Sequence, residues 1–156
     1  MREITHIIIH CSDSAWGCAR EINEWHRERG WGTQTIPPIG YHFVLLNARP
    51  EPGIVIPALE GQIECGRKVQ DVGAHCLGFN LNSIGICLIG NGPNTFVLEQ
   101  FNSLKSLLMD LCTTYRIPPE NILGHRETDS GKAEGKTCPN FAVEDIRTWM
   151  RGRIYH

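Results

Sequence analysis

The sequence predicts one α/β domain over residues 1–156, in which helices flank a mixed β-sheet. Short runs of β-branched residues alternate along the chain with longer segments whose apolar residues recur every three or four positions. The composition, with 41% hydrophobic and 21% charged residues in 156, is typical of one globular domain that buries a core. The formal net charge of -2 indicates no bulk attraction to nucleic acid, so we expect no nucleic-acid partner.

Five segments have the pattern of strands. Residues 4–10 are dense in β-branched side chains, as in a buried strand, and residues 83–90 have the composition of a central strand. Weaker strand patterns occur in residues 40–47, 62–65 and 122–124. In the first of these, the alternation of side chains predicts that Tyr41 and Phe43 lie on the face opposite His42.

Three segments have helical periodicity. Residues 19–29 predict an amphipathic helix, and Gly30 stands where a helix commonly ends in a glycine. The other helical segments are residues 98–115 and 143–150. The connections are polar, and the most informative are a loop at 71–82, rich in Gly, Asn and His, and a Gly-rich loop between His125 and Lys136.

The cysteines indicate reduced thiols. Seven are present, an odd number, and no CxxC pair occurs, which argues against a disulfide framework and excludes a four-cysteine zinc finger. Cys87 lies inside an apolar run and Cys112 on the apolar face of a helix, so both are interpreted as small buried residues.

The N-terminal residues lack the features of an export signal. No apolar core follows the basic start, and no apolar run approaches the ~20 residues of a membrane span. We therefore expect synthesis in the cytosol without a Sec signal and no membrane insertion. Nothing in the sequence demands more than a monomer.

Two histidines and a cysteine suggest a metal site. His10 and His125 each end an apolar strand at a polar loop, where a sheet presents side chains to a cleft, and Cys138 lies on the connection after His125. Imidazole and thiolate bind zinc readily, and three protein ligands leave the fourth position of a catalytic zinc for water. We hypothesise that His10, His125 and Cys138 hold one zinc ion.

Other interpretations of these residues stay open at this point. A single histidine at a strand end, or a cysteine before proline, is more often structural than a ligand. The remaining histidines also compete as ligands: His6, His26, His42, His75 and His156. His26 suits a helix surface or packing, whereas His75, in the Gly/Asn loop, is equally suited to substrate contact and to loop hydrogen bonding.

Two further side chains suit catalysis beside such a metal. Lys136 lies two residues before Cys138, so in extended backbone both side chains project to the same side, within roughly 7 Å. An ammonium there can stabilise a developing oxyanion. Tyr41 begins a strand expected to neighbour these loops, and its phenol suits orientation of the water or the oxyanion.

Six motifs together resemble the zinc-dependent N-acetylmuramoyl-L-alanine amidases of the bacteriophage lysozyme (endolysin) type, whose fold is shared with peptidoglycan recognition proteins. The motifs are residues 8–12, 20–31, 40–43, 73–86, 124–125 and 136–139. The resemblance implies that His10, His125 and Cys138 are the zinc ligands, with one ion per chain, and that Tyr41 and Lys136 are the catalytic pair. It implies a peptidoglycan or muropeptide substrate, cleaved at the amide between N-acetylmuramic acid and L-alanine.

Within the fourth motif, we expect His75 and Asn82 to bind substrate. Relatives that recycle muropeptides in the cytosol have an acidic residue where this chain has Cys87, and aspartate as the third ligand. The chain therefore resembles the phage-type branch, and we expect it to act on the cell wall after release. Residues 33–39 and 49–59 look longer than in compact phage amidases, which predicts a reshaped rim near Tyr41.

Two other functions are alternatives to the amidase. One is a non-catalytic peptidoglycan-binding module, against which Cys138, Lys136 and Tyr41 argue, because such modules typically lack the cysteine. The other is a cysteine hydrolase that uses Cys138 or Cys11 with a neighbouring histidine. The latter predicts activity that survives chelation and is lost on thiol alkylation.

Overall fold

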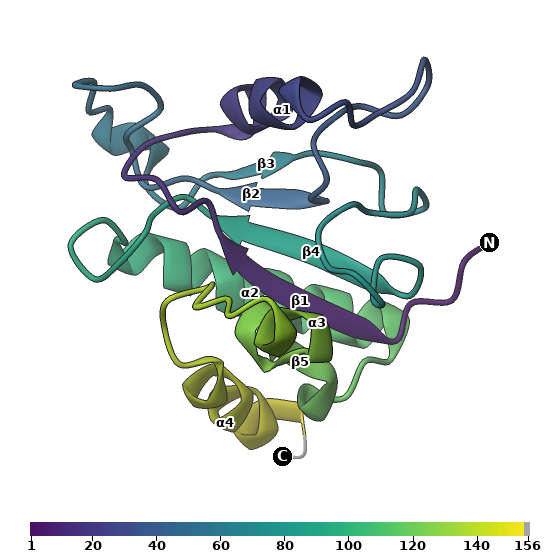
Figure 1. The fold of residues 1–156 in the computed structure, drawn as a ribbon. Coiled ribbons are helices and arrows are strands. Elements are labelled where there is room, and N and C mark those ends of the chain that lie inside the picture. Colours follow the sequence, from purple (N-terminus) through teal and green to yellow (C-terminus); the bar gives the residue numbers. More distant parts are fainter. Residues whose placement is uncertain (155–156) are drawn as a thin grey trace.

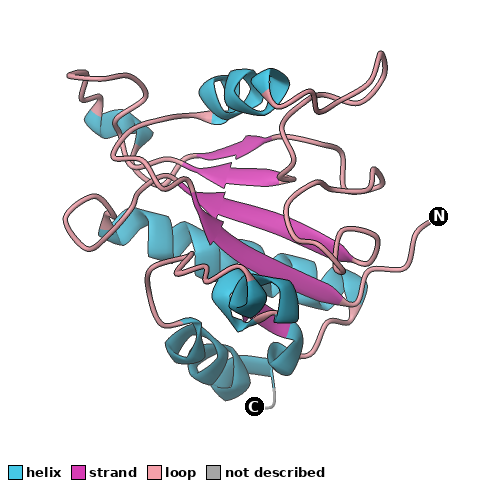
Figure 2. Ribbon diagram, in the orientation of Figure 1, coloured by secondary structure: helices cyan, strands magenta, loops and turns pink. Residues whose placement is uncertain are grey.

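Residues 1–154, which the computed structural model describes, form a five-stranded sheet with helices on both faces (Figures 1 and 2). The strand order is β3-β2-β4-β1-β5. The strands are β1 (His6–Cys11), β2 (Phe43–Leu45), β3 (Ile63–Cys65), β4 (Ser83–Leu88) and β5 (Ile122–Gly124). All neighbouring pairs are parallel except β2 and β3, which pair antiparallel at one edge. The predicted mixed sheet is thus confirmed, with residues 83–88 at its centre.

The central strands are buried on both faces, which explains their near-continuous apolar sequences. In β1, Ile7 and Ile9 belong to the larger core, formed with α2 (Leu98–Tyr115) and α4 (Val143–Ile154). Because side chains alternate along a strand, His10 projects from the opposite face, the one that α1 (Ala19–Glu28) covers. Cys87 and Cys112 are buried, as their apolar surroundings predicted.

A buried glutamine joins α2 to the sheet. The side-chain oxygen of Gln100 accepts a hydrogen bond from Val97 N at 2.9 Å, which satisfies one free N–H of the first helical turn. Its amide donates to the carbonyls of Leu45 (3.0 Å), the last residue of β2, and of Ile89 (2.8 Å), the residue after β4. Gln100 therefore fixes where α2 begins against the sheet.

No helix among the described residues is both long and apolar enough to cross a bilayer.

The second predicted strand is shorter than its pattern indicates. Regular pairing begins only at Phe43, because the backbone bends at His42. Tyr41 consequently packs with Val44 in the smaller core beneath α1, whereas Phe43 packs against the larger core. The prediction that Tyr41 and Phe43 share a face is therefore wrong, and the bend directs the Tyr41 ring toward His10.

The segment between His125 and Lys136 is also more regular than predicted. It contains the short helix α3 (Asp129–Ala133), which Thr128 caps by accepting a hydrogen bond from Gly131 N at 3.0 Å. The Thr128 hydroxyl donates to the His125 carbonyl at 2.8 Å, so the cap is tied directly to a predicted ligand residue. The final helix, α4, continues to Ile154 rather than ending at residue 150.

Candidate metal centre and active site

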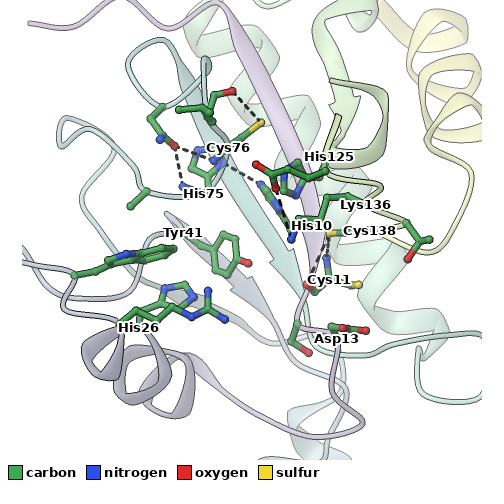
Figure 3. A pocket seen from close by; sticks show the side chains of 18 of the residues that line it. His10, Cys11, Asp13, His26, Tyr41, His75, Cys76, His125, Lys136 and Cys138 are labelled. Carbon is green, nitrogen blue, oxygen red and sulfur yellow. Dashed lines mark hydrogen bonds and ion pairs between the residues drawn. The ribbon is translucent and has the colours of Figure 1, made fainter. Parts of the chain in front are cut away.

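A cavity of about 650 Å³ opens over the sheet face that carries His10. Figure 3 shows that Tyr41 and His26 lie on one side of it, and His125, Lys136 and Cys138 on the other. Its walls come from the end of β1, the α1 region, the loop before β4, and the connection after β5. Because β1 and β5 are parallel neighbours, the segments that follow them leave the sheet at the same edge, whereas the loop before β4 comes from the opposite edge.

The three predicted ligand residues lie together at the base of this cavity. One nitrogen each of His10 and His125 and the sulfur of Cys138 all lie within 4.8 Å of one another. Zinc bonds of about 2.0–2.1 Å to nitrogen and about 2.3 Å to sulfur require separations shorter than this upper limit. The donor set, two imidazoles and one thiolate, fits a zinc ion with one open position.

Burial keeps the rings at this site neutral. Desolvation, followed by the neighbouring histidines, holds the pKa of His10 well below 6.5, and desolvation does the same for His75. Burial and then Lys136 also lower the pKa of His125. Neutral imidazoles have the lone pairs that a metal ligand needs.

The sulfur of Cys138 is held by the neighbouring strand end. Cys11 N donates a hydrogen bond to this sulfur at 3.1 Å, and Arg126 N donates to the Cys138 carbonyl at 2.8 Å. The shared hydrogen bond with the Cys11 thiol and burial raise the pKa of the Cys138 thiol. A bound cation would offset this effect, because coordination deprotonates a thiol.

The two proposed catalytic residues differ in burial. Lys136 is half-exposed and lies 3.7 Å from the Glu134 carboxylate at the cavity rim. Its backbone N donates to the carbonyl of Gly131, within α3, at 2.8 Å, which ties Lys136 to the end of that helix. The Tyr41 ring lies 5.0 Å from the His10 ring, between centroids, and burial raises the pKa of the phenol well above 10.

His75 lies beside His10 rather than at the cavity mouth. Its Nδ1 is 2.9 Å from His10 Nε2, and its Nε2 is 3.3 Å from the Ser83 hydroxyl. Both ring nitrogens therefore have protein partners, which leaves neither free to act as a fourth ligand. The sequence left two roles open for His75, substrate contact and hydrogen bonding, and this geometry supports hydrogen bonding.

Asn82 is not among the residues that line the cavity. Its carbonyl accepts hydrogen bonds from Thr5 N (2.8 Å) and His6 N (3.2 Å), at the start of β1. Four strand residues separate this position from His10, or roughly 13 Å. The expectation that Asn82 contacts substrate there has no support in this geometry, and Asn80 lines the cavity instead.

Sequence reasoning assigned no catalytic or binding role to three lining residues from the α1 region, although all lie in a motif noted for the family resemblance. They are His26, Arg29 and Trp31. His26 is buried and its Nδ1 accepts a hydrogen bond from Gly40 N at 2.8 Å, so its packing interpretation is the right one. The three-residue spacing of His26 and Arg29, which puts both on one helix face, was the available signal. His156 lies outside the described residues.

Similarity to known proteins agrees with this site. The profile of the family described as N-acetylmuramoyl-L-alanine amidase matches residues 1–141. The chain is 33% identical to the endolysin of Escherichia phage T7 over 152 residues, which cover 92% of this chain and 83% of the phage protein. It is 30% identical to peptidoglycan-recognition protein SC2 of Drosophila melanogaster, with 94% and 74% of the two chains covered.

Solved structures have the same fold. The N-acetylmuramoyl-L-alanine amidase LysC from Clostridium intestinale URNW matches with a TM-score of 0.75 and 25% identity, over 96% of this chain and 87% of that one. Drosophila PGRP-LB matches with a TM-score of 0.68 and 26% identity, over 96% and 82%. Fold and site thus define an amide hydrolase of the endolysin type, built on the peptidoglycan recognition protein fold. The chain belongs to the N-acetylmuramoyl-L-alanine amidase family, as its motifs predicted.

Proposed function

We propose that this chain uses one zinc ion, held by His10, His125 and Cys138, to hydrolyse the amide between N-acetylmuramic acid and L-alanine in peptidoglycan. The observation that carries the proposal is the convergence of two imidazoles and one sulfur within 4.8 Å at the base of a cavity. A three-ligand site with an open position is the arrangement of catalytic rather than structural zinc.

The residues around the site have separate roles in this proposal. When bound, zinc supplies a Lewis acid that lowers the pKa of water and polarises the scissile carbonyl. Lys136 presents its ammonium to the oxyanion that develops on that carbonyl. Tyr41 remains a neutral phenol and donates a hydrogen bond within the cavity, because its pKa is well above the working pH.

The substrate proposal draws on the relatives. The phage relative named above is an endolysin, and a mutant of Drosophila PGRP-LB was solved in complex with tracheal cytotoxin. By analogy, this chain takes peptidoglycan or its fragments as a monomeric enzyme and acts on the cell wall after release from the cytosol.

Chelation of the purified protein tests the metal. We expect metal removal to abolish release of stem peptides from isolated peptidoglycan, and added zinc to restore it. Mass spectrometry of the digest should show free lactyl carboxylates on N-acetylmuramic acid and new L-alanine amino termini. Cys138→Ala should lose zinc and activity together.

Each alternative gives a different result in the same assay. Activity that survives chelation but not thiol alkylation would replace the zinc mechanism with a cysteine hydrolase. Binding to walls without any released peptide would indicate the non-catalytic module. Turnover of soluble muropeptides without turnover of intact walls would favour a recycling amidase.

A further inference from the structure

A chain of three side chains runs from the metal centre into the sheet. His10 Nε2 lies 2.9 Å from His75 Nδ1, and His75 Nε2 lies 3.3 Å from the Ser83 hydroxyl oxygen. All three residues are buried, with His75 the most exposed at 9%. Since His10 Nε2 faces His75, only His10 Nδ1 is left for a metal.

The ring of His75 has little freedom to turn. A Cβ at Gly85 would lie 2.6 Å from its Cγ and Cδ2 atoms, and one at Gly73 would lie 2.5 Å from Cδ2. The absence of side chains at these two glycines is therefore what admits the ring. Asn80 holds the backbone, because its side-chain oxygen accepts hydrogen bonds from His75 N (2.8 Å) and Cys76 N (2.9 Å).

Which nitrogen carries the hydrogen in the series His10–His75–Ser83 decides whether His10 can bind a metal. A neutral imidazole has one N–H and one lone pair. If His10 donates its Nε2–H to His75, the lone pair of His10 Nδ1 is free toward the metal. If His75 donates instead, His10 Nε2 accepts and Nδ1 carries the hydrogen, so no lone pair is available.

We propose that His75 is a positioning residue that accepts the Nε2–H of His10 and thereby fixes the tautomer and ring orientation that the metal requires. Ser83 completes the arrangement by accepting the Nε2–H of His75. The inference rests on the proposed zinc function and deepens it, and it replaces substrate contact as the role of His75. Partners of this kind commonly contribute 10–100-fold, roughly, to metal affinity.

Four variants separate this role from general packing. His75→Ala removes the acceptor, whereas His75→Asn keeps an oxygen acceptor close to the position of Nδ1. Ser83→Ala removes only the acceptor for His75 Nε2 with little change of volume. His6→Asn is the matched control. His6 lies on the same strand as His10, but its ring hydrogen bonds to the Thr5 hydroxyl and it does not line the cavity.

The first measurement is the tautomer of His10 in the metal-free, full-length protein, from long-range ¹H–¹⁵N spectra of histidine-labelled samples. We expect the hydrogen on Nε2 in the wild type and a mixture of tautomers in His75→Ala. A wild-type His10 that carries its hydrogen on Nδ1 would overturn the proposal. This readout does not depend on zinc or on hydrolysis, so it stands even if chelation leaves wall hydrolysis intact and the proposed function fails.

The second measurement is zinc affinity by competition with a chromophoric chelator. His75→Ala should bind roughly 10–100-fold more weakly, His75→Asn should recover most of that loss, and His6→Asn should match the wild type. Ser83→Ala should fall between the wild type and His75→Ala, and it carries the test if His75→Ala does not fold. Unchanged affinity in folded His75→Ala, or equal losses in the alanine and asparagine variants, would refute the positioning role.

Discussion

At the scale of single residues, burial sets what each group near the metal site can do. Tyr41 keeps its phenolic hydrogen at neutral pH, because burial raises its pKa well above 10. It therefore suits hydrogen-bond donation rather than service as an anionic base. Lys136 is half-exposed and free to move, and its ion pair with Glu134 joins two exposed groups. Such pairs contribute only about 0.2–1 kcal/mol, so Lys136 can leave Glu134 for a substrate oxyanion.

We predict that Lys136→Ala retains zinc but loses most turnover. Removal of one group that stabilises an oxyanion typically lowers kcat by about 10²–10³-fold. Lys132→Ala is a suitable control, since Lys132 is an exposed residue of the neighbouring helix α3 and does not line the cavity. Steady-state kinetics on soluble muropeptides, with zinc content measured on the same samples, would check the prediction. Near-normal turnover in Lys136→Ala would remove this residue from the catalytic machinery.

At the scale of elements, one arginine joins the helix α4 to the segment that carries His125. Arg147 is 8% exposed and donates to Ile122 O at 2.8 Å and to both oxygens of the Glu127 carboxylate, at 2.6 and 2.9 Å. The same carboxylate accepts a hydrogen bond from Gly124 N at 2.6 Å. The turn that presents His125 is thus held from both sides by one buried ion pair.

Loss of this ion pair should destabilise the protein. We predict that Arg147→Ala lowers the free energy of unfolding by about 3 kcal/mol, since removal of one partner leaves a partly buried carboxylate without its cation. Arg151→Ala, on the same helix, removes pairs with Glu120 and Glu144 that are exposed to solvent and should cost much less. Urea unfolding of the two variants would make the comparison. Equal losses would show that burial of the Arg147 pair has no special weight.

Some elements follow from sequence patterns alone, whereas others depend on contacts with distant segments. The apolar and β-branched run of residues 83–88 predicted β4, because a continuous run indicates a strand buried on both faces. The three- and four-residue repeat of 98–115 predicted α2, because it indicates a helix with one buried face. The helix α3 was not predicted, since three of its five residues (Asp129, Ser130 and Gly131) have low helix propensity and its start depends on the Thr128 cap. At this bend His42 contacts β4 and, through its Nε2 and the Asp71 carbonyl at 2.9 Å, the loop before β4. His42 N donates to Gly85 O, and His42 Nδ1 accepts from Gly85 N, at 2.9 and 3.0 Å.

At the scale of the whole molecule, the parallel sheet explains why ligands far apart in sequence converge. His10 lies near the end of β1, and His125 follows β5, its parallel neighbour, so both side chains are presented at the same edge of the sheet. Sequence alone located these strand ends and suggested Cys138 as the third ligand, but the family resemblance was needed to choose this set over the alternatives. The return of the chain to Cys138 depends on α3 and on the hydrogen bond from Cys11 N, which no local pattern predicts. The His10–His75 contact could not be predicted from the sequence, because the loop before β4 has no periodic pattern that would show where its side chains point.

Buried neutral histidines also give the whole fold a dependence on pH. Burial is the main cause that lowers the pKa of His26 and of His42 to about 4, against about 6.5 in an unfolded chain. Between these values the unfolded state binds more protons than the folded state, so the free energy of unfolding falls as the pH is lowered from 6.5. Each histidine contributes a slope of about 1.4 kcal/mol per pH unit, or about 3 kcal/mol by pH 4, below which its effect is complete.

His26→Asn isolates one of these contributions. The asparagine oxygen can still accept the hydrogen bond that Gly40 N donates to His26 Nδ1 at 2.8 Å, but the side chain no longer titrates. We predict that the variant loses less stability than the wild type between pH 6.5 and 4, with the difference approaching about 3 kcal/mol. Urea unfolding of both proteins in the presence of chelator would measure it, because the remaining histidines then titrate alike in both and their effects cancel. If the free energy of unfolding of the two proteins changed equally with pH, His26 would be protonated as readily in the folded protein as in the unfolded chain. That result would contradict the burial that its contacts with Trp31 and Tyr41 indicate.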